Sequence, residues 1–335
     1  MDAVLIAVVA LGITFDFSNG FHDSSNSIAA LVATRAARPG PAVAMASFFT
    51  ILGPILVATA VADTIGGIVT LDASETLIVL LSALLAGLIW NIFTWYRGLP
   101  SSSSHALVGG LVGAGLVMAG ASAINWGGLD GLKPIGVLGV LIGLAISPVL
   151  GAAVALAVSY GARRGTRRAT KNLRKPVKRG EWVAAATLAF THGANDAQKT
   201  MGVITLALVA GNAIPSFVVP LWVKLACGLA LTAGTALGGW RIVHTIGRTI
   251  YRMRPLDGLV SSGSSAAVIG AASFLGAPVS TTHVVSSSVV GTGVARHLHH
   301  VGWKVVRDIL LAWLVTMPVC AVIAGVVCLI GKAIT

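Results

Sequence analysis

Two segments of this chain place charged and amide side chains in the middle of long apolar stretches. The first covers residues 17–26 and reads FSNGFHDSSN, and the second covers residues 190–199 and reads FTHGANDAQK. A phenylalanine, a glycine and an aspartate stand in register, which pairs Asp23 with Asp196. An ionised carboxylate in hydrocarbon costs several kcal/mol, so a carboxylate there indicates a functional site. Two at matching positions predict a site at the interface between two repeats.

Composition places the chain in the membrane. Of 335 residues, 56% are hydrophobic and only 10% are charged, whereas soluble domains carry about 25% charged residues. Apolar segments recur along the whole length and leave no room for a separate soluble domain. The sequence therefore predicts an all-α polytopic membrane protein with about 10–12 transmembrane or re-entrant helices. We expect no enzyme activity, since there is no nucleophile-elbow or zinc motif, and we expect no cofactor and no resident metal.

The charges predict how the chain crosses the bilayer. The net charge is +12, and nine Lys or Arg residues without an acid lie between Arg163 and Arg179. Such a cluster is typical of a cytoplasmic loop facing anionic lipid head groups, and nucleic acid is not an expected partner. With the N-terminus outside, 19 of the 23 Lys and Arg fall on the cytoplasmic side of ten apolar segments.

Five segments per half is an odd number, so the halves must enter the membrane from opposite sides. We expect two inverted repeats, residues 1–160 and 181–335, joined by a basic cytoplasmic loop at 161–180. The segments 3–34 and 182–210 are too long for one span, since 32 residues of helix reach about 48 Å against roughly 30 Å of hydrocarbon. We expect both helices to be broken at the polar motifs, near the membrane midplane.

A second motif is also duplicated. Residues 99–105 read LPSSSSH and residues 277–283 read APVSTTH, and each is followed by a glycine-rich helix. Proline followed by hydroxyl residues indicates a helix N-terminus. Helix N-termini bind oxyanions through free N–H groups. Two such ends, one per half, can clamp a tetrahedral anion from both sides, although small residues also serve close helix packing.

The carboxylates then accept a hydrogen bond from a protonated anion, or they bind a coupling cation or proton. Neutral ligands would come from Asn19, Asn26 and Asn195. His22 and His192, like His105 and His283, either relay protons or hold the backbone by hydrogen bonds. Lys199 can neutralise Asp196, contact the anion, or extend its charged end towards the membrane surface.

Both motif pairs closely resemble those of the PiT family of inorganic phosphate transporters. G-A-N-D at 193–196 with its variant G-F-H-D at 20–23, and P-V-S-T-T-H at 278–283 with P-S-S-S-S-H at 100–105, look like that family's signatures. The resemblance implies secondary transport of phosphate at a midplane site, and commonly a homodimer. The implied substrate-binding residues are Asp23, Asn26, Ser102, Ser103, Ser104, Asp196, Lys199, Ser280, Thr281 and Thr282. The candidate coupling-ion residues are Asn19, His22, Asp23, His192, Asn195 and Asp196.

One departure from the family pattern bears on the coupling ion. Sodium-coupled members are expected to carry glutamates at two positions that are Thr50 and Ser262 here. This favours a proton-coupled importer in the inner membrane of a bacterium, with inorganic phosphate, a coupling cation and the lipid bilayer as its partners. Sodium-coupled phosphate symport and a sulfate permease of the same family remain alternatives. A passive anion channel is disfavoured by the paired carboxylates.

Overall fold

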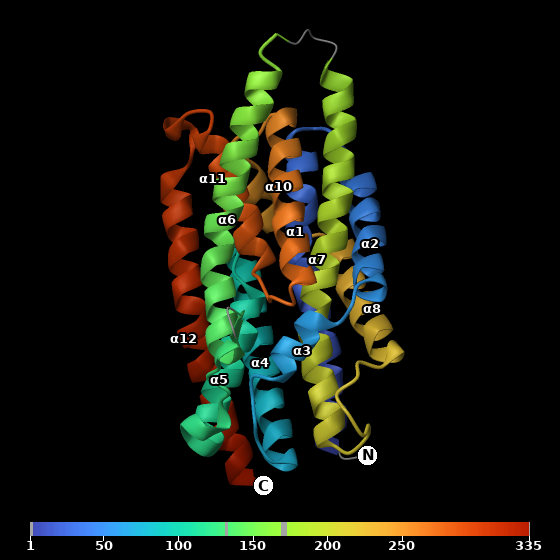
Figure 1. Cartoon of the computed structure of the whole chain (residues 1–335), viewed down its shortest axis with the longest axis vertical. Helices are drawn as coiled ribbons and strands as arrows, with labels where there is room; N and C mark the ends of the chain where they lie inside the picture. Colours follow the sequence, from blue (N-terminus) through green and yellow to red (C-terminus); the bar gives the residue numbers. More distant parts are fainter. Residues whose placement is uncertain (1–2, 131–132, 169–172, 335) are drawn as a thin grey trace.

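In the part of the chain that the structure describes, the protein is a bundle of helices with one short antiparallel pair of strands (Figure 1). A computed structural model describes residues 3–130, 133–168 and 173–334. Its elements are α1 (Ala3–Ala33), α2 (Pro39–Leu56), α3 (Ala60–Gly66), α4 (Ala73–Arg97), α5 (Ser103–Ala119), η1 (Gly120–Ala123), β1 (Gly128–Asp130), β2 (Lys133–Ile135), α6 (Gly136–Gly165), α7 (Arg174–Ala210), α8 (Leu221–Leu237), α9 (Trp240–His244), η3 (Thr245–Ile250), α10 (Pro255–Phe274), α11 (Thr281–Val294), η4 (Leu298–His300) and α12 (Trp303–Ile334). The all-α class is confirmed.

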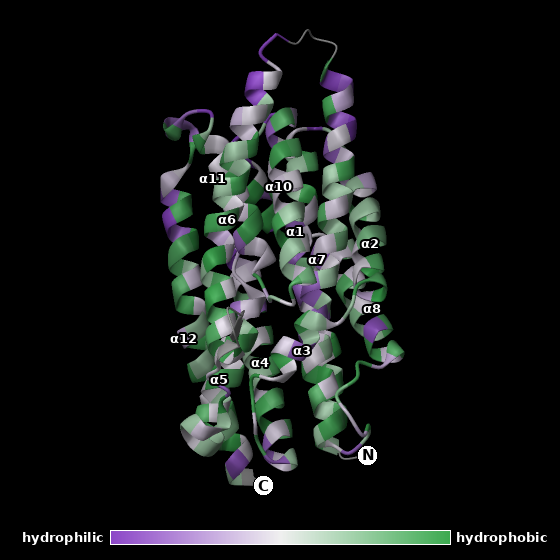
Figure 2. Cartoon of the chain, viewed as in Figure 1, coloured by the Kyte–Doolittle hydropathy of each residue, from purple (hydrophilic) through white to green (hydrophobic). Residues whose placement is uncertain are grey.

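Among the described residues, six helices are long and apolar enough to cross a membrane, namely α1, α2, α4, α5, α6 and α12. A seventh crossing is offered by α8 together with α9 and η3, which meet at a bend of 62°. Figure 2 shows hydrophilic ribbon concentrated where α6 and α7 approach their connection. Residues 169–172 of the expected basic loop lie outside the described residues, and α6 and α7 extend into that loop as far as Gly165 and Arg174.

The expected breaks in the first helix of each half are wrong in position. Both α1 and α7 run through their polar motifs without interruption. The glycines of the two motifs do not break the helices. They let α1 and α7 pack closely against neighbouring helices. A Cβ on Gly20 would lie 2.1 Å from the carbonyl oxygen of Leu231, and one on Gly193 would lie 2.1 Å from that of Thr50. Only glycine lets two helix backbones approach this closely.

The helices are broken elsewhere in the interior. Between α4 and α5 the chain leaves helix at residues 98–102, and between α10 and α11 it does so at 275–280. Figure 1 shows α10 and α11 meeting near mid-height of the molecule. With 14 residues, α11 is about 21 Å long and cannot cross roughly 30 Å of hydrocarbon. Its N-terminus lies inside the protein, since Ser280, Thr281 and Thr282 are buried.

Packing between helices follows the repeat predicted from the motifs. α1 packs on α8 and its counterpart α7 packs on α2, while α5 packs on α12 and its counterpart α11 packs on α6. The close approaches repeat as well, because a Cβ on Gly113 would lie 2.2 Å from the carbonyl oxygen of Ala321 and one on Gly291 would lie 2.3 Å from that of Ala152. Each half thus supplies helices that pack on the other half, and the interior lies between two inverted repeats.

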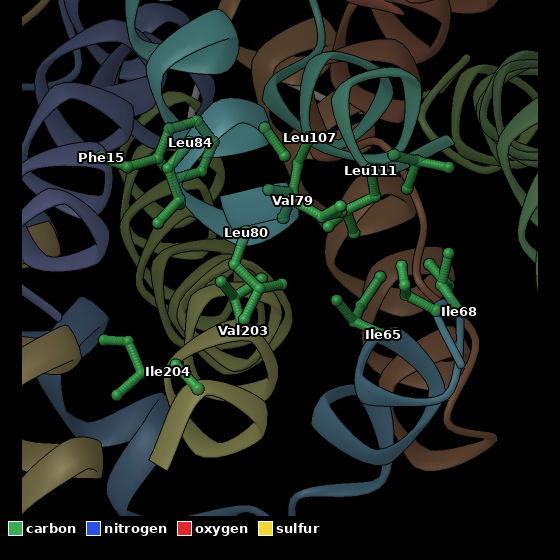
Figure 3. Close-up of a cluster of buried hydrophobic side chains, with 14 of the residues drawn as sticks. Phe15, Ile65, Ile68, Val79, Leu80, Leu84, Leu107, Leu111, Val203 and Ile204 are labelled. Carbon is green, nitrogen blue, oxygen red and sulfur yellow. The ribbon is translucent and has the colours of Figure 1, made fainter. Parts of the chain in front are cut away.

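Two apolar clusters lie at different depths, with a polar layer between them. The terminal-side cluster, on the side of the chain ends in Figure 1, includes Leu5, Phe15, Leu80, Leu84, Leu107, Leu111, Val203 and Ile204. Figure 3 shows part of it, with Phe15 against Leu84. The second cluster lies towards the connection between α6 and α7, and we call it the loop-side cluster. It includes Ile28, Leu31, Ala185, Leu188, Ile269, Val284, Ile309 and Trp313. Because α1 and α7 contribute to both clusters, their polar middles are enclosed between two apolar layers.

Candidate functional site

The polar middle of α1 presents His22 and Asp23, which are both buried. Nδ1 of His22 lies 2.7 Å from Oδ1 of Asp23. The other ring nitrogen lies 3.1 Å from the hydroxyl of Thr94 on α4 and 3.3 Å from that of Ser101. The imidazole is therefore held from both sides, and a proton on Nδ1 can be shared with the carboxylate.

The polar middle of α7 presents a similar group with an added cation. The Lys199 ammonium donates to Oδ1 of Asp196, and Nδ1 of His192 lies 3.0 Å from Oδ2. Lys199 also donates to the Ser104 hydroxyl at 2.6 Å and to the Val279 carbonyl at 2.8 Å. Of the three roles considered for Lys199, neutralisation of Asp196 matches this geometry, because the ammonium is buried and points into the protein.

The N-termini of α5 and α11 meet these carboxylates. Ser102 and Ser280 are the N-cap residues, and each accepts a hydrogen bond from a backbone N–H three residues later at 3.2 Å. Their hydroxyl oxygens thus serve the helix ends. The following hydroxyls reach further, since Thr282 donates to Asp23 at 2.9 Å and Thr281 donates to Asp196 at 2.7 Å. Ser103 donates to Asp23 at 3.4 Å.

Three amides complete the layer. Asn26 donates to the Thr282 hydroxyl at 3.1 Å, and Asn195 donates to the Ser273 hydroxyl at 3.0 Å. Within the described part of the chain, the Oδ1 atoms of Asn19, Asn26 and Asn195 are buried and accept no hydrogen bond. An unpaired buried carbonyl oxygen is costly, so each is a ready acceptor for a proton donor or a cation.

The structure brings together most residues singled out from the sequence. The carboxylates, His22, Lys199, Asn26 and the hydroxyls that follow the two caps form one connected network. His192 lies 3.0 Å from Asp196, but neither of its ring nitrogens forms a hydrogen bond within the described part of the chain. The other two motif histidines pack against each other. The rings of His105 and His283 are 4.5 Å apart, and His283 is stacked on Trp313 at 3.7 Å. This stacking favours a structural role for that pair over proton relay.

Sequence reasoning missed several polar residues at this depth. Asp16 is fully buried on α1 and accepts a hydrogen bond from Thr200 of α7 at 2.5 Å. Gln198 accepts from the backbone N–H of Val61 at 3.0 Å and joins α7 to α3. The signal for Asp16 was available, since it is a carboxylate within an apolar segment, but it has no acidic counterpart in the second half. By the register of the motifs its counterpart is Ala189.

A buried polar layer at the junction of two inverted helical repeats, with helix N-termini directed into it, defines a membrane transporter. The chain belongs to the phosphate transporter family, which its residues 19–324 match. It is 41% identical over 324 residues to a probable low-affinity inorganic phosphate transporter of Rhizobium meliloti, covering 96% of this chain and 95% of the relative. To a protein of the same description from Bacillus subtilis it is 38% identical, covering 97% of both chains.

A solved structure supports the same assignment. The chain superimposes on a protein described as the sodium-dependent phosphate transporter with a TM-score of 0.87 and 25% identity, covering the whole of both chains. The protein is therefore a phosphate transporter and not an enzyme, as the motifs predicted.

Proposed function

We propose that the protein imports inorganic phosphate by proton-coupled symport, with phosphate held between the N-termini of α5 and α11. One observation carries this proposal, namely the convergence of hydroxyls from both helix ends on Asp23, Asp196 and Lys199. Phosphate offers acceptor oxygens to these hydroxyls and to Lys199. A protonated phosphate also donates to the carboxylates, which sulfate does not do. The proposed substrate-binding set also keeps Asn26, Ser102 and Ser280, the last two through the helix ends that they cap.

The charge of the site supports coupling to protons. Two carboxylates and one ammonium give a formal charge of −1, and a phosphate monoanion adds another. In a low-dielectric interior this repulsion is large unless protons accompany the anion. Each carboxylate has an imidazole within hydrogen-bonding distance, at 2.7 Å for His22 and 3.0 Å for His192. Protonation of one imidazole or carboxylate would return the total charge from −2 to the −1 of the empty site, so protons and phosphate bind best together.

The positions expected to carry glutamates in sodium-coupled relatives are neutral and buried. Thr50 is 1% exposed and its hydroxyl donates to the carbonyl of Ala189 at 3.5 Å, and Ser262 is 3% exposed. Sodium coupling nevertheless has an observation in its favour. The unpaired oxygens of Asn19, Asn26 and Asn195 are suitable ligands for a hard cation, and the similar solved structure is described as sodium-dependent.

Uptake of labelled phosphate into proteoliposomes separates these two functions. With an inward pH gradient in sodium-free buffer, the proposal expects accumulation that rises as external pH falls and collapses with a protonophore. A sodium gradient at equal pH serves as the matched condition, and excess sulfate tests anion selectivity. A strict need for external sodium, with no response to the protonophore, would replace proton coupling by sodium coupling and leave phosphate transport standing.

The charge pattern indicates how the protein is oriented in its membrane. We further propose that the protein lies in the inner membrane of a bacterium, with the N-terminus outside and the basic connection between α6 and α7 in the cytoplasm. The similarity to bacterial relatives supports the location. The proposed division into repeats is 1–160 and 181–335. A homodimer is expected from the family resemblance, and its mass in detergent solution tests this.

A further inference from the structure

A third carboxyl group, that of Asp16, lies near the proposed phosphate site and is buried. Asp16 precedes Asp23 by seven residues on α1, which is about two helical turns or roughly 10 Å. It accepts a hydrogen bond from Thr200, which lies one turn after Asp196 on α7, and the thiol of Cys227 on α8 lies within reach as a weaker donor. Asp16 is thus displaced from the proposed phosphate site towards the terminal-side cluster. That is the side on which we place the exterior.

The surroundings of Asp16 differ from those of the other two carboxylates. Asp23 and Asp196 each have an imidazole and a hydroxyl, and Asp196 also has an ammonium. In the described part of the chain, Asp16 forms no ion pair, and its Oδ2 is buried without a hydrogen-bond partner. An ionised carboxylate in such a place keeps most of its desolvation cost, because one hydroxyl returns only part of it. A carboxyl group that carries a proton avoids that cost.

Few charged groups face Asp16. Cys227 on α8 faces it as a thiol, and the nearest charged groups on α7 are Asp196 and Lys199, which carry opposite charges. On α1 itself the nearest charged group is Asp23 with its histidine. The adjoining Phe15 belongs to the terminal-side cluster and lies beside Leu84 of α4 (Figure 3).

We propose that Asp16 is the residue that takes up the coupling proton from the exterior. When the terminal-side cluster opens, water reaches the ionised carboxylate, and a hydronium ion loses one O–H bond and becomes water as an O–H bond forms at Oδ2. The neutral carboxyl then permits the apolar cluster to close over it, as in the present structure. The same O–H bond breaks when the other side opens, and the proton leaves to cytoplasmic water. This inference rests on the proposed proton coupling.

The asymmetry of the two halves supports this assignment. At the position that corresponds to Asp16, α7 carries Ala189, whose carbonyl accepts a hydrogen bond from Thr50. Asp23 and Asp196 are duplicated because both halves enclose the same anion. A carboxyl group found in only one half serves one side of the membrane, as expected for a group that meets protons from the exterior.

Asp16→Asn tests the assignment directly, because the amide copies the shape of the neutral carboxyl and cannot release a proton. In proteoliposomes, exchange of phosphate at equal pH should persist in this variant. The ratio of accumulation with and without a pH gradient should fall by at least about fivefold, the lower range of a coupling between two ligands. If the wild type responds to the pH gradient and Asp16→Asn responds equally, this inference fails and the proposed function stands. If the wild type follows only sodium, both fail.

A second pair of variants keeps the test valid if Asp16→Asn does not fold. Thr200→Val removes the hydroxyl that favours the ionised carboxylate. The external pH for half-maximal uptake should therefore move upward, by about one to two pH units. Thr205→Val is the matched control, since Thr205 is also fully buried on α7 but its hydroxyl oxygen has no partner. Equal pH profiles for the two variants would overturn the proposal.

Infrared spectroscopy gives a readout that does not depend on transport. In the reconstituted wild-type protein, the C=O stretch of a protonated carboxyl should be present at neutral pH. It should shift in Thr200→Val and stay in place in Thr205→Val. A spectrum without any protonated carboxyl band would also overturn the proposal.

Discussion

Thr282 of α11 donates a 2.9 Å hydrogen bond to Oδ1 of Asp23, a residue of α1 that lies 259 positions earlier in the chain. The adjacent Thr281 donates at 2.7 Å to Asp196 of α7. One helix N-terminus therefore joins the carboxylates of both polar motifs. In the proposed function, phosphate takes over these hydroxyls and so changes the contacts of α1 and α7 at the same time.

Loss of either motif carboxylate should abolish transport. Asp23→Asn and Asp196→Asn keep the shape of the side chain but remove the charge that accepts protons and balances the site. We expect Asp23→Asn to reach the membrane in normal amounts and Asp196→Asn in lower amounts, because it leaves the buried Lys199 ammonium without its partner. Per folded protein, both should show no phosphate uptake above background. Uptake near the wild-type level in either variant would contradict the assigned role of that carboxylate.

The hydroxyls of α11 should set the affinity for phosphate. Thr281→Val or Thr282→Val removes a donor to a charged ligand, a contact of about 1.5–3 kcal/mol, so KM should rise about tenfold or more. Thr292→Val is the matched control, because Thr292 donates only to the backbone of its own helix at Ser288. The comparison is made by uptake at graded phosphate concentrations. Equal KM values for the three variants would remove α11 from the binding site.

Lys199 should matter for stability as well as for transport. Lys199→Met leaves Asp196 buried with an uncompensated charge, which costs about 3–5 kcal/mol, and a lower thermal unfolding midpoint should report it. The double variant Lys199→Met with Asp196→Asn removes both charges and should regain much of that stability without regaining transport. If the double variant were no more stable than Lys199→Met, the ion pair would not explain the loss.

The glycines of the two polar motifs should be needed for packing. Gly20→Ala and Gly193→Ala place a Cβ against a backbone carbonyl of α8 or α2 and should destabilise the protein by about 1–3 kcal/mol. Gly161→Ala is the control, since an added Cβ there meets nothing within 4 Å. Thermal unfolding of the three variants in one detergent checks this. Equal thermal unfolding midpoints would mean that the added Cβ atoms do not lower the stability of the helix packing.

The sidedness of the helices is tested by cysteine labelling in a variant without Cys227, Cys320 and Cys328, which are all buried. A cysteine at Gly165, at the end of α6, should react only with reagent on the cytoplasmic side. One at Ser74, at the start of α4, should react only with reagent outside. Labelling of both from one side of the membrane would refute the proposed orientation.

The sequence was enough to predict the fold class, and duplication and buried charge, which are visible in residue types alone, indicated a set of residues that the structure brings together. The fold class is confirmed by the helices and by the family to which the chain belongs. Helix boundaries were less predictable. Asn19 and Gly20 looked like a helix break, yet α1 continues through them, since a glycine inside a packed bundle is equally a site of close helix contact.

Some site contacts depend on distances that no sequence pattern contains. Ser102 and Ser104 belong to one motif, but the first hydroxyl oxygen accepts from its own helix end and the second accepts from Lys199. Asp16 lies outside every duplicated motif, so only its burial and its contact with Thr200 bring it into the account. Repeats reveal what the two halves share, and the structure is needed to find what differs between them.

The central claim is that phosphate binds between the N-termini of α5 and α11, and the anomalous signal of arsenate in crystals tests it most directly. Arsenate is tetrahedral like phosphate, and its arsenic atom can be located without reference to the protein density. We expect one peak at hydrogen-bonding range from the hydroxyls of Ser103, Ser104, Thr281 and Thr282, and no such peak in Asp196→Asn. A peak elsewhere in the protein, with none between these two helix ends, would contradict the account.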